Sequence, residues 1–314
     1  MGPFAGSKSR RRAAFGLLTG TLGVVVWWLM SGWPLSLHLL RFYPKKLGSA
    51  VVGWAANRSI PVSLREPLLG RFARRYGANV DEAEKPLKEY RGLQDFFTRR
   101  LRPGLRPQDA LVAGALNSPV DARIIAYGEI TEGLAIQAKG LPYRVAELLK
   151  HDPMAARFEG GRFMTLYLAP KDYHRIHVPL QGAVSAVGRV EGELWPVNDA
   201  STGHVPRLYE RNRRATWIAT GTGPDEGLEV AAVLVGATHV GGVVIAERWL
   251  EGRKLPKDGA FQVPQLPCAP GDDLGTFEFG STVVLLIGGP RAKDWKGLRT
   301  EGDIKVGQRL GAFE

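Results

Sequence analysis

Three patterns of hydrophobic and polar positions follow one another along the chain. Residues 13–40 contain no Asp, Glu, Lys or Arg. From about residue 108 onward, short apolar runs alternate with Gly, Pro and Asp turns, which is typical of β-strands. Between these parts, apolar side chains recur at three- and four-residue steps, with arginines among them, as in amphipathic helices: Val62, Leu64, Leu68, Leu69, Phe72 and Tyr76. The pattern predicts a hydrophobic membrane anchor with a basic start over 1–40, an amphipathic helical region over 41–107 and a β-rich domain over 108–314.

The apolar stretch 13–33 would be about 31 Å long as a helix, which is about one hydrocarbon thickness. Basic residues precede it, and Trp27, Trp28 and Trp33 gather at its far end, where indole rings prefer the membrane interface. A cleaved signal peptide, a spanning helix and an embedded anchor that does not span all remain open. No clear small-residue cleavage site follows the stretch, while Pro34 interrupts a straight helix. We therefore expect membrane attachment of open geometry.

The segment 62–77 is predicted to form a basic amphipathic helix, and Leu93–Arg100 a second short helix. A basic amphipathic helix beside an apolar anchor suits a membrane surface. A helix that packs on its own domain with a solvated basic face fits the same periodicity, so both alternatives stand.

The third part has runs of strand length that are rich in β-branched and aromatic residues. One helix is expected near Arg144–Lys150. The fold class is therefore α+β, with a mainly β, sandwich- or barrel-like domain preceded by membrane-associated helices. The predicted strands are Arg162–Leu168, Val184–Val190, Leu228–Val235, Val240–Ala246 and Phe277–Ile287.

Composition narrows the class of partner. The net charge of +11 favours an anionic partner, and because no nucleic-acid-binding signature accompanies it, a membrane is favoured over nucleic acid. The single cysteine, Cys268, excludes an internal disulfide, and the six histidines form no zinc pattern, so no metal is expected.

Four residues are candidates for catalysis: a serine, two histidines and an aspartate. Ser281 stands between Gly280 and an apolar run, His174 and His177 lie in one segment after a predicted strand, and Asp121 follows a Pro-Val turn. Together they indicate an Asp–His–Ser arrangement, in which the aspartate orients the imidazole and the imidazole takes the serine proton. Taken singly, Asp121 is more typical of a turn residue and a lone histidine of a structural one.

The glycine before the serine favours self-cleavage over hydrolysis of another molecule. The Gly-x-Ser-x-Gly elbow of hydrolases is absent, whereas Gly280 has no Cβ to block the approach of the Ser281 hydroxyl to its carbonyl. Such an intramolecular attack gains about 7–11 kcal/mol from proximity. A membrane-tethered serine hydrolase and a non-catalytic β module remain the alternatives.

Four motifs in this order carry a resemblance to a known family: Ser118-Pro-Val-Asp121, Asp172-Tyr-His-Arg-Ile-His177, Val235-Gly-Ala-Thr238 and Phe279-Gly-Ser-Thr282. From about Arg41 to its end, the chain resembles phosphatidylserine decarboxylase, a pyruvoyl-dependent family.

The resemblance implies a complete set of roles. Asp121, His177 and Ser281 would form the self-processing triad, and the cut between Gly280 and Ser281 would give chains 1–280 and 281–314, which form a heterodimer with possible further homo-oligomers. Ser281 would become a covalent pyruvoyl group that forms a Schiff base with the substrate, a membrane phospholipid. His174 would serve the decarboxylation of phosphatidylserine to phosphatidylethanolamine.

Three departures accompany the resemblance. Ala122 stands where the family commonly has glycine, Arg213 where an acid is usual and Phe279 where leucine is common, while His239 is at a variable position and is expected to be structural. Arg175 is a candidate for the lipid phosphate only because it adjoins His174, and a structural role is its alternative.

Overall fold

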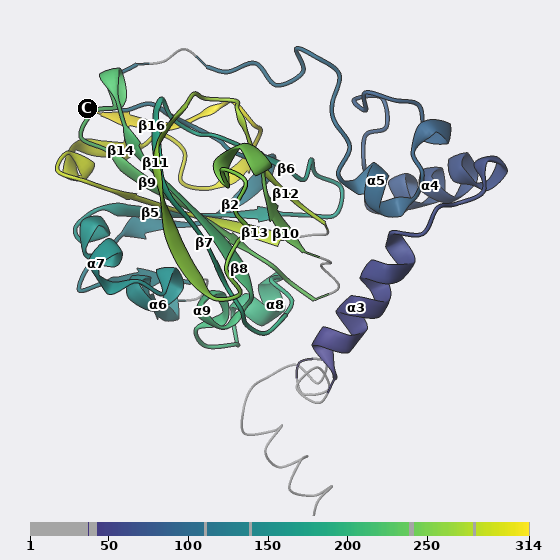
Figure 1. Ribbon diagram of the computed structural model, residues 1–314, viewed down its shortest axis with the longest axis horizontal. Coiled ribbons are helices and arrows are strands. Elements are labelled where there is room, and N and C mark those ends of the chain that lie inside the picture. The colour runs from purple at the N-terminus through teal and green to yellow at the C-terminus, as the bar shows by residue number, and fades with distance from the viewer. Residues whose placement is uncertain are drawn as a thin grey trace, which may run out of the picture. The chain divides into compact units, whose positions relative to one another are not determined.

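Figure 1 shows the computed structural model, which describes residue 37 and residues 43–109, 112–137, 140–238, 242–278 and 281–313, without the side chain of Ser281. The chain divides into two compact units, Met1–Pro44 and Lys45–Glu314, and everything below concerns the second. The predicted anchor at 13–33 lies outside the described residues. Within the described ranges, no helix is both long and apolar enough to cross a bilayer.

A helical segment opens the second unit. It contains α3 (Lys45–Ala56), α4 (Val62–Tyr76), a 3₁₀ turn η1 (Leu87–Glu89) and α5 (Leu93–Phe97). The helix α4 starts after Pro61 and ends at Gly77, whose φ of 78° is readily adopted by glycine. A small core holds these elements together: Leu69, Ala73, Ala78, Ala83, Tyr90 and Phe96.

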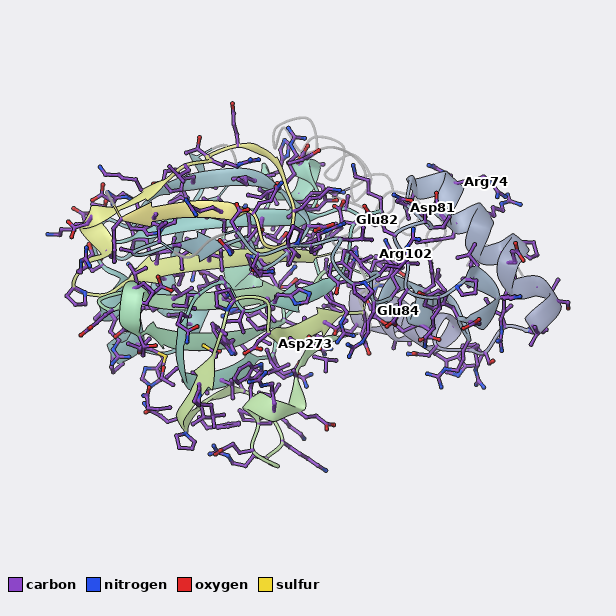
Figure 2. All side chains as sticks on the ribbon, turned by 90° about the horizontal axis from the view of Figure 1, so that it is seen from above. Arg74, Asp81, Glu82, Glu84, Arg102 and Asp273 are labelled. Carbon is purple, nitrogen blue, oxygen red and sulfur yellow. The ribbon has the colours of Figure 1, made fainter. Side chains whose placement is uncertain are left out.

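The chain then returns alongside this segment before it enters the β-rich body. Backbone hydrogen bonds join Arg102 to Glu82 and Glu84 to Arg100, each with an N–O distance of 2.9 Å. Figure 2 shows Glu82, Glu84 and Arg102 at this crossing, between the helices and the sheets. The crossing places Glu82 next to the domain that carries the candidate site.

Eight strands of the described residues form one antiparallel sheet, here called the large sheet. Their order across the sheet is β11 (Gly259–Cys268), β7 (Gly182–Val190), β8 (Arg214–Gly221), β9 (Glu229–Val235), β13 (Ser281–Gly288), β5 (Arg162–Leu168), β2 (Ala122–Glu129) and β15 (Gly302–Ile304).

The strand β13 lies inside the large sheet, with β9 on one side and β5 on the other. The residues Val283–Ile287 are fully buried, because both faces of this strand are covered. A run of β-branched and aliphatic residues suits such a position. The first residue of this buried strand is therefore Ser281.

Smaller sheets and short helices surround the large sheet (Figure 1). The strands of the smaller sheets are β1 (Leu116–Asn117), β16 (Arg309–Phe313) and β14 (Trp295–Gly297); β10 (Val243–Ile245), β12 (Asp273–Phe277) and β6 (Arg175–His177); and β3 (Leu134–Ile136) with β4 (Pro142–Arg144). The helices are α6 (Val145–Leu149), α7 (Asp152–Ala155), α8 (Asp199–Thr202) and α9 (Leu208–Arg211), and the 3₁₀ turns are η3 (Ala156–Phe158), η4 (Gly223–Asp225), η5 (Glu247–Trp249) and η6 (Ala292–Asp294).

The prediction of a mainly β body with a few helices is confirmed, and most predicted strands agree with the observed ones. The prediction of one strand over Phe277–Ile287 is wrong. Phe277 ends β12 in one sheet and Ser281 begins β13 in another, so the chain changes sheet at the candidate cleavage point. An apolar pattern does not reveal such a change, because Phe277 at the end of β12 and the apolar residues of β13 lie close together in the sequence.

Candidate active site

The register of the large sheet fixes where Ser281 lies. Ser281 pairs with Leu168, the last residue of β5, and the next residue, Thr282, pairs with Val235 at the end of β9. The loop that continues from Leu168 carries His174, and β6 then carries His177. Gly280 and the Ser281 side chain are outside the described residues, so the backbone register gives the position of the serine.

His174 is fully buried, and its ring centroid lies 4.0 Å from that of Phe97 in α5. Its Nδ1 is 2.8 Å from the carbonyl oxygen of Asp172. A carbonyl only accepts hydrogen bonds, so Nδ1 carries the proton and Nε2 has the lone pair. Among the described residues Nε2 has no partner. Burial lowers the pKa of His174 to about 3, so the imidazole is neutral at pH 7 and has a free acceptor.

His177 is held from both sides. Its Nδ1 is 2.8 Å from the carbonyl oxygen of Gly271, and its Nε2 is 3.1 Å from the hydroxyl of Tyr173, whose ring stacks on the imidazole. The Gly271 carbonyl therefore fixes the tautomer with the lone pair on Nε2. Burial is the largest cause of the lowered pKa of His177. This imidazole is neutral and can accept a proton.

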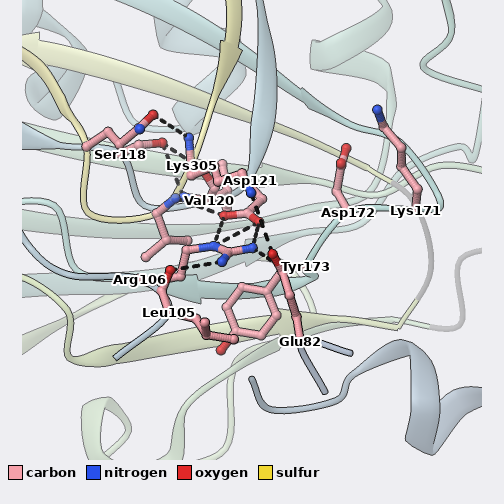
Figure 3. A network of polar contacts seen from close by, with 12 residues as sticks. Glu82, Leu105, Arg106, Ser118, Val120, Asp121, Lys171, Asp172, Tyr173 and Lys305 are labelled. Atoms are coloured by element: carbon pink, nitrogen blue, oxygen red, sulfur yellow. Dashed lines mark hydrogen bonds and ion pairs between the residues drawn. The ribbon is translucent and has the colours of Figure 1, made fainter. Parts of the chain in front are cut away.

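Asp121 is engaged by a different partner from the one the sequence suggests. Nε of Arg106 lies 2.9 Å and 3.0 Å from the two carboxylate oxygens, Nη2 lies 2.5 Å from Oδ2, and the backbone N–H of Val306 donates to Oδ1 at 2.9 Å. Figure 3 shows this network, in which Arg106 also donates to Glu82 at 2.7 Å. No hydrogen bond among the described residues joins Asp121 to His177.

The carboxylates of Asp121 and Glu82 hold the Arg106 guanidinium in place through ion pairs. Burial by itself lowers the pKa of Arg106, but the hydrogen bonds to Asp121 and Glu82 outweigh it and raise that pKa. A bidentate guanidinium–carboxylate pair is among the strongest charge-assisted contacts. Lys305 adds a second cation 3.6 Å from Glu82. The network joins the helical segment, the start of β2 and the end of the chain.

Two cavities flank the loop 168–174. The larger, of about 440 Å³, is mainly apolar and includes Phe72, Phe97, Leu168 and Thr238 in its lining. The smaller, of about 220 Å³, has a strongly charged lining: Glu82, Arg99, Arg106, Asp121, Lys171, Asp172, Asp303 and Lys305, with the neutral residues Gly77, Asn79, Ala122, Tyr173 and Ile304. An apolar space and a charged space thus lie on the same loop as His174.

The structure also places the remaining residues that the sequence singled out. Arg175 is paired with Asp273, and Arg213 is paired with Glu191 at 3.0 Å. Ala122 is buried at the start of β2, and Cys268 is a buried free thiol. His239 and Phe279 lie outside the described residues.

Sequence reasoning missed Arg106, Tyr173, Gly271 and Arg99. Tyr173 lies inside the motif Asp172–His177, so its position in the sequence already indicates that it is near the histidines. The others act through contacts between segments that are far apart in the sequence, such as those of His177 and Gly271, which are 94 positions apart.

Comparison with known proteins identifies the family. A sequence model described as phosphatidylserine decarboxylase matches residues 93–312. A phosphatidylserine decarboxylase proenzyme of Anaeromyxobacter is 41% identical over 287 residues, covering 88% of this chain and 98% of the relative. Proenzymes of the same name from Myxococcus xanthus and Pseudomonas putida are 37% and 38% identical, covering 88% and 90% of this chain and 98% and 96% of the relatives. The chain therefore belongs to the phosphatidylserine decarboxylase family.

Proposed function

We propose that this chain cuts itself between Gly280 and Ser281 and then, as a carboxy-lyase, converts phosphatidylserine to phosphatidylethanolamine and CO₂. The observation that carries the proposal is the position of Ser281. It begins β13 directly beside the end of β5, whose continuation bears both histidines. Family membership supports the reaction, and this register supports the assignment of its residues.

In self-processing, His177 acts as the base. Its Nε2 releases the hydroxyl of Tyr173 and takes the proton from the Ser281 hydroxyl, and the serine oxygen attacks the Gly280 carbonyl, so that a C–O bond forms as the C–N bond breaks and the serine nitrogen takes up the proton. The Gly271 carbonyl holds the required tautomer. The negative charge of Asp121 acts at longer range and favours the protonated form of His177.

The ester that results breaks by elimination across Cα–Cβ of residue 281. Loss of the Cα proton expels the Gly280 carboxylate, and hydrolysis of the remaining enamine releases ammonia. Residue 281 is left as a pyruvoyl group at the start of chain 281–314. When present, this group supplies a carbonyl that accepts the electron pair left by departing CO₂.

The surroundings of residue 281 fit such a group. The apolar cavity is lined by its strand partner Leu168, and the buried Nε2 of His174 is an acceptor without a partner among the described residues. We assign His174 the proton transfer of decarboxylation. Its lone pair takes a proton when substrate charge approaches, because a nearby anion raises the pKa of an imidazole.

The two product chains stay together as a heterodimer. The short chain 281–314 keeps β13 between β9 and β5, pairs β15 with β2 and pairs β16 with β1. A cut at the first residue of β13 leaves these ladders intact. Holding them together needs no contact across the broken bond.

The helical segment is assigned to the membrane surface. Leu47, Val51 and Trp54 lie at helical spacing on α3, and all three are exposed. Leu64 and Leu68 are exposed on α4, which also carries basic residues. An exposed apolar stripe beside basic side chains suits an anionic lipid surface.

Intact mass of the purified protein, before and after borohydride reduction, tests the proposal. We expect two chains of 280 and 34 residues, the shorter one gaining the mass of two hydrogens on reduction. Ser281→Ala should stay as one inactive chain, whereas Ser63→Ala, on the exposed side of α4, should be cut as in the wild type. A full-length wild-type chain with full activity would refute the proposal, and labelling of that intact chain by a serine-reactive phosphonate would indicate a hydrolase instead.

A further inference from the structure

The charged cavity beside α5 contains a buried arginine whose charge is not balanced by an adjacent carboxylate. Arg99 is 4% exposed, and it lines this cavity. Its guanidinium makes two long hydrogen bonds, from Nη1 to the Phe96 carbonyl at 3.5 Å and from Nη2 to the Lys171 carbonyl at 3.3 Å, and its Cζ lies 5.0 Å from the centroid of the Phe96 ring. Its Nε has no hydrogen-bond partner among the described residues.

A second buried arginine shows what a structural role looks like in this molecule. Arg214 is fully buried in β8, and its guanidinium donates to four backbone carbonyls: Leu148 at 2.6 Å, Glu210 at 2.6 Å, Asn212 at 2.9 Å and Glu147 at 2.5 Å. Arg214 therefore has its donors satisfied and does not line the charged cavity. The Arg99 guanidinium makes fewer and longer hydrogen bonds than that of Arg214. A structural role as a donor to backbone carbonyls therefore does not explain why Arg99 is buried.

The carboxylates that line the cavity do not neutralise Arg99 through an ion pair either. Glu82 and Asp121 are bound by Arg106, and no ion pair within the described part of the chain includes Arg99. Asp172 accepts from the N–H of Ala169, and burial raises its pKa to about 6. A cation in this state has donors to offer to an incoming anion, because an unpaired buried charge is costly.

Arg99 is also close to the residue assigned to decarboxylation. Phe97, two residues earlier, packs against the His174 ring and lines the apolar cavity. Asp172, whose carbonyl accepts from His174, lines the charged cavity together with Arg99. A phospholipid has the same division, since its head group is charged and its acyl chains are apolar.

We propose that Arg99 binds an oxyanion of the phospholipid head group, the phosphate or the serine carboxylate, in the charged cavity beside His174. This inference rests on the proposed function and assigns a substrate contact to it. The planar guanidinium forms paired hydrogen bonds with either oxyanion. Arg175, adjacent to His174 in the sequence, is already paired with Asp273.

The test compares Arg99→Gln with Arg100→Gln, which removes the same charge from the exposed neighbouring residue. Both variants should be cut into two chains. With phosphatidylserine in mixed micelles, Arg99→Gln should lower kcat/KM about tenfold to hundredfold, mainly through KM, and Arg100→Gln less than threefold. Arg99→Lys should recover part of the loss, because it restores the charge without the fork.

Product inhibition distinguishes the two oxyanions. Phosphatidylethanolamine keeps the phosphate but lacks the carboxylate. If Arg99→Gln weakens its inhibition as much as it raises KM for phosphatidylserine, the phosphate is the group bound. If inhibition is unchanged while KM rises, it is the carboxylate.

Equal kcat/KM values for the two glutamine variants in a wild-type background that is cut and active would overturn the inference and leave the proposed function standing. A wild-type chain that is not cut would instead refute the function. If Arg99→Gln prevents processing, phosphatidylserine binding is measured on the uncut Ser281→Ala chain with and without Arg99→Gln, at matched thermal midpoints. Equal affinities there would also overturn the inference.

Discussion

The large sheet and the helical segment 45–101 differ in how far they bury their apolar side chains. In the sheet, every residue of Val283–Ile287 is fully buried between β5 and β9. In the helical segment, α3 buries only its small residues Ser49, Gly53 and Ala56 and exposes larger apolar ones. The large sheet buries the apolar residues of β13 on both faces and fixes the backbone of Ser281, whereas the helices leave large apolar side chains exposed.

The largest expected effect concerns processing at the sheet edge. His177→Ala removes the base and should slow self-cleavage by about 10²- to 10⁴-fold, measured as the appearance of two chains on a denaturing gel after synthesis. His204→Ala, whose imidazole bonds the Ala200 carbonyl away from these residues, is the matched control and should be cut at the wild-type rate. Cleavage of His177→Ala at that rate would assign the base to another group.

A substitution at the junction between the two regions should lower the free energy of unfolding nearly as much as a substitution in the core. Arg106→Gln leaves the carboxylates of Asp121 and Glu82 without their buried cation and should cost about 3 kcal/mol of unfolding free energy in the Ser281→Ala chain. Arg71→Gln, on the exposed side of α4, should change it by less than about 0.5 kcal/mol. Equal values from urea denaturation would mean that the network does not couple the regions.

The cores of the two regions should respond unequally to the same truncation. Leu285→Ala in β13 creates a cavity in a fully buried strand and should cost about 3 kcal/mol. Leu64→Ala on α4, where the leucine is 48% exposed, should cost less than about 1 kcal/mol. A similar loss at both positions, measured in the uncut chain, would show that the leucine on α4 is covered in solution.

Acid should lower the free energy of unfolding, because His174 is buried as a neutral imidazole. The folded pKa is lowered to about 3, while the unfolded imidazole titrates near 6.5, so the unfolded state binds the extra proton between these values. Stability from this group is therefore full above pH 6.5 and is lost as pH falls toward 3. Between pH 7.5 and 5 the loss of unfolding free energy should be about 2 kcal/mol larger in the uncut Ser281→Ala chain than in the same chain with His174→Gln.

Asp172 acts with the opposite sign in part of the same range, because its folded pKa is raised to about 6. The comparison of two variants at each pH cancels that contribution. An identical pH dependence of the unfolding free energy in both chains would mean that His174 is hydrated and titrates normally.

The smallest effect concerns the exposed face of α3. Val51→Glu should weaken binding to vesicles containing anionic lipid several-fold and leave self-cleavage unchanged, because it places a charge in the apolar stripe. Ser63→Glu adds the same charge to a polar exposed position of α4 and should weaken binding less. Equal binding of the two variants in a sedimentation assay would remove α3 from the membrane surface.

The sequence alone predicts the mainly β body and a helix over 62–77, which the structure shows over Val62–Tyr76, and it proposes Asp121, His174, His177 and Ser281 as site residues. These follow from periodicity and from motifs that are local in the chain. Four features follow only from the three-dimensional fold: the change of sheet before Ser281, the orientation of His177 by the Gly271 carbonyl, the pairing of Arg106 with Asp121, and the Nε donor of Arg99 that has no partner among the described residues. Each of these depends on which distant segments share a hydrogen bond or a desolvated space, and a local pattern of side chains does not encode that pairing.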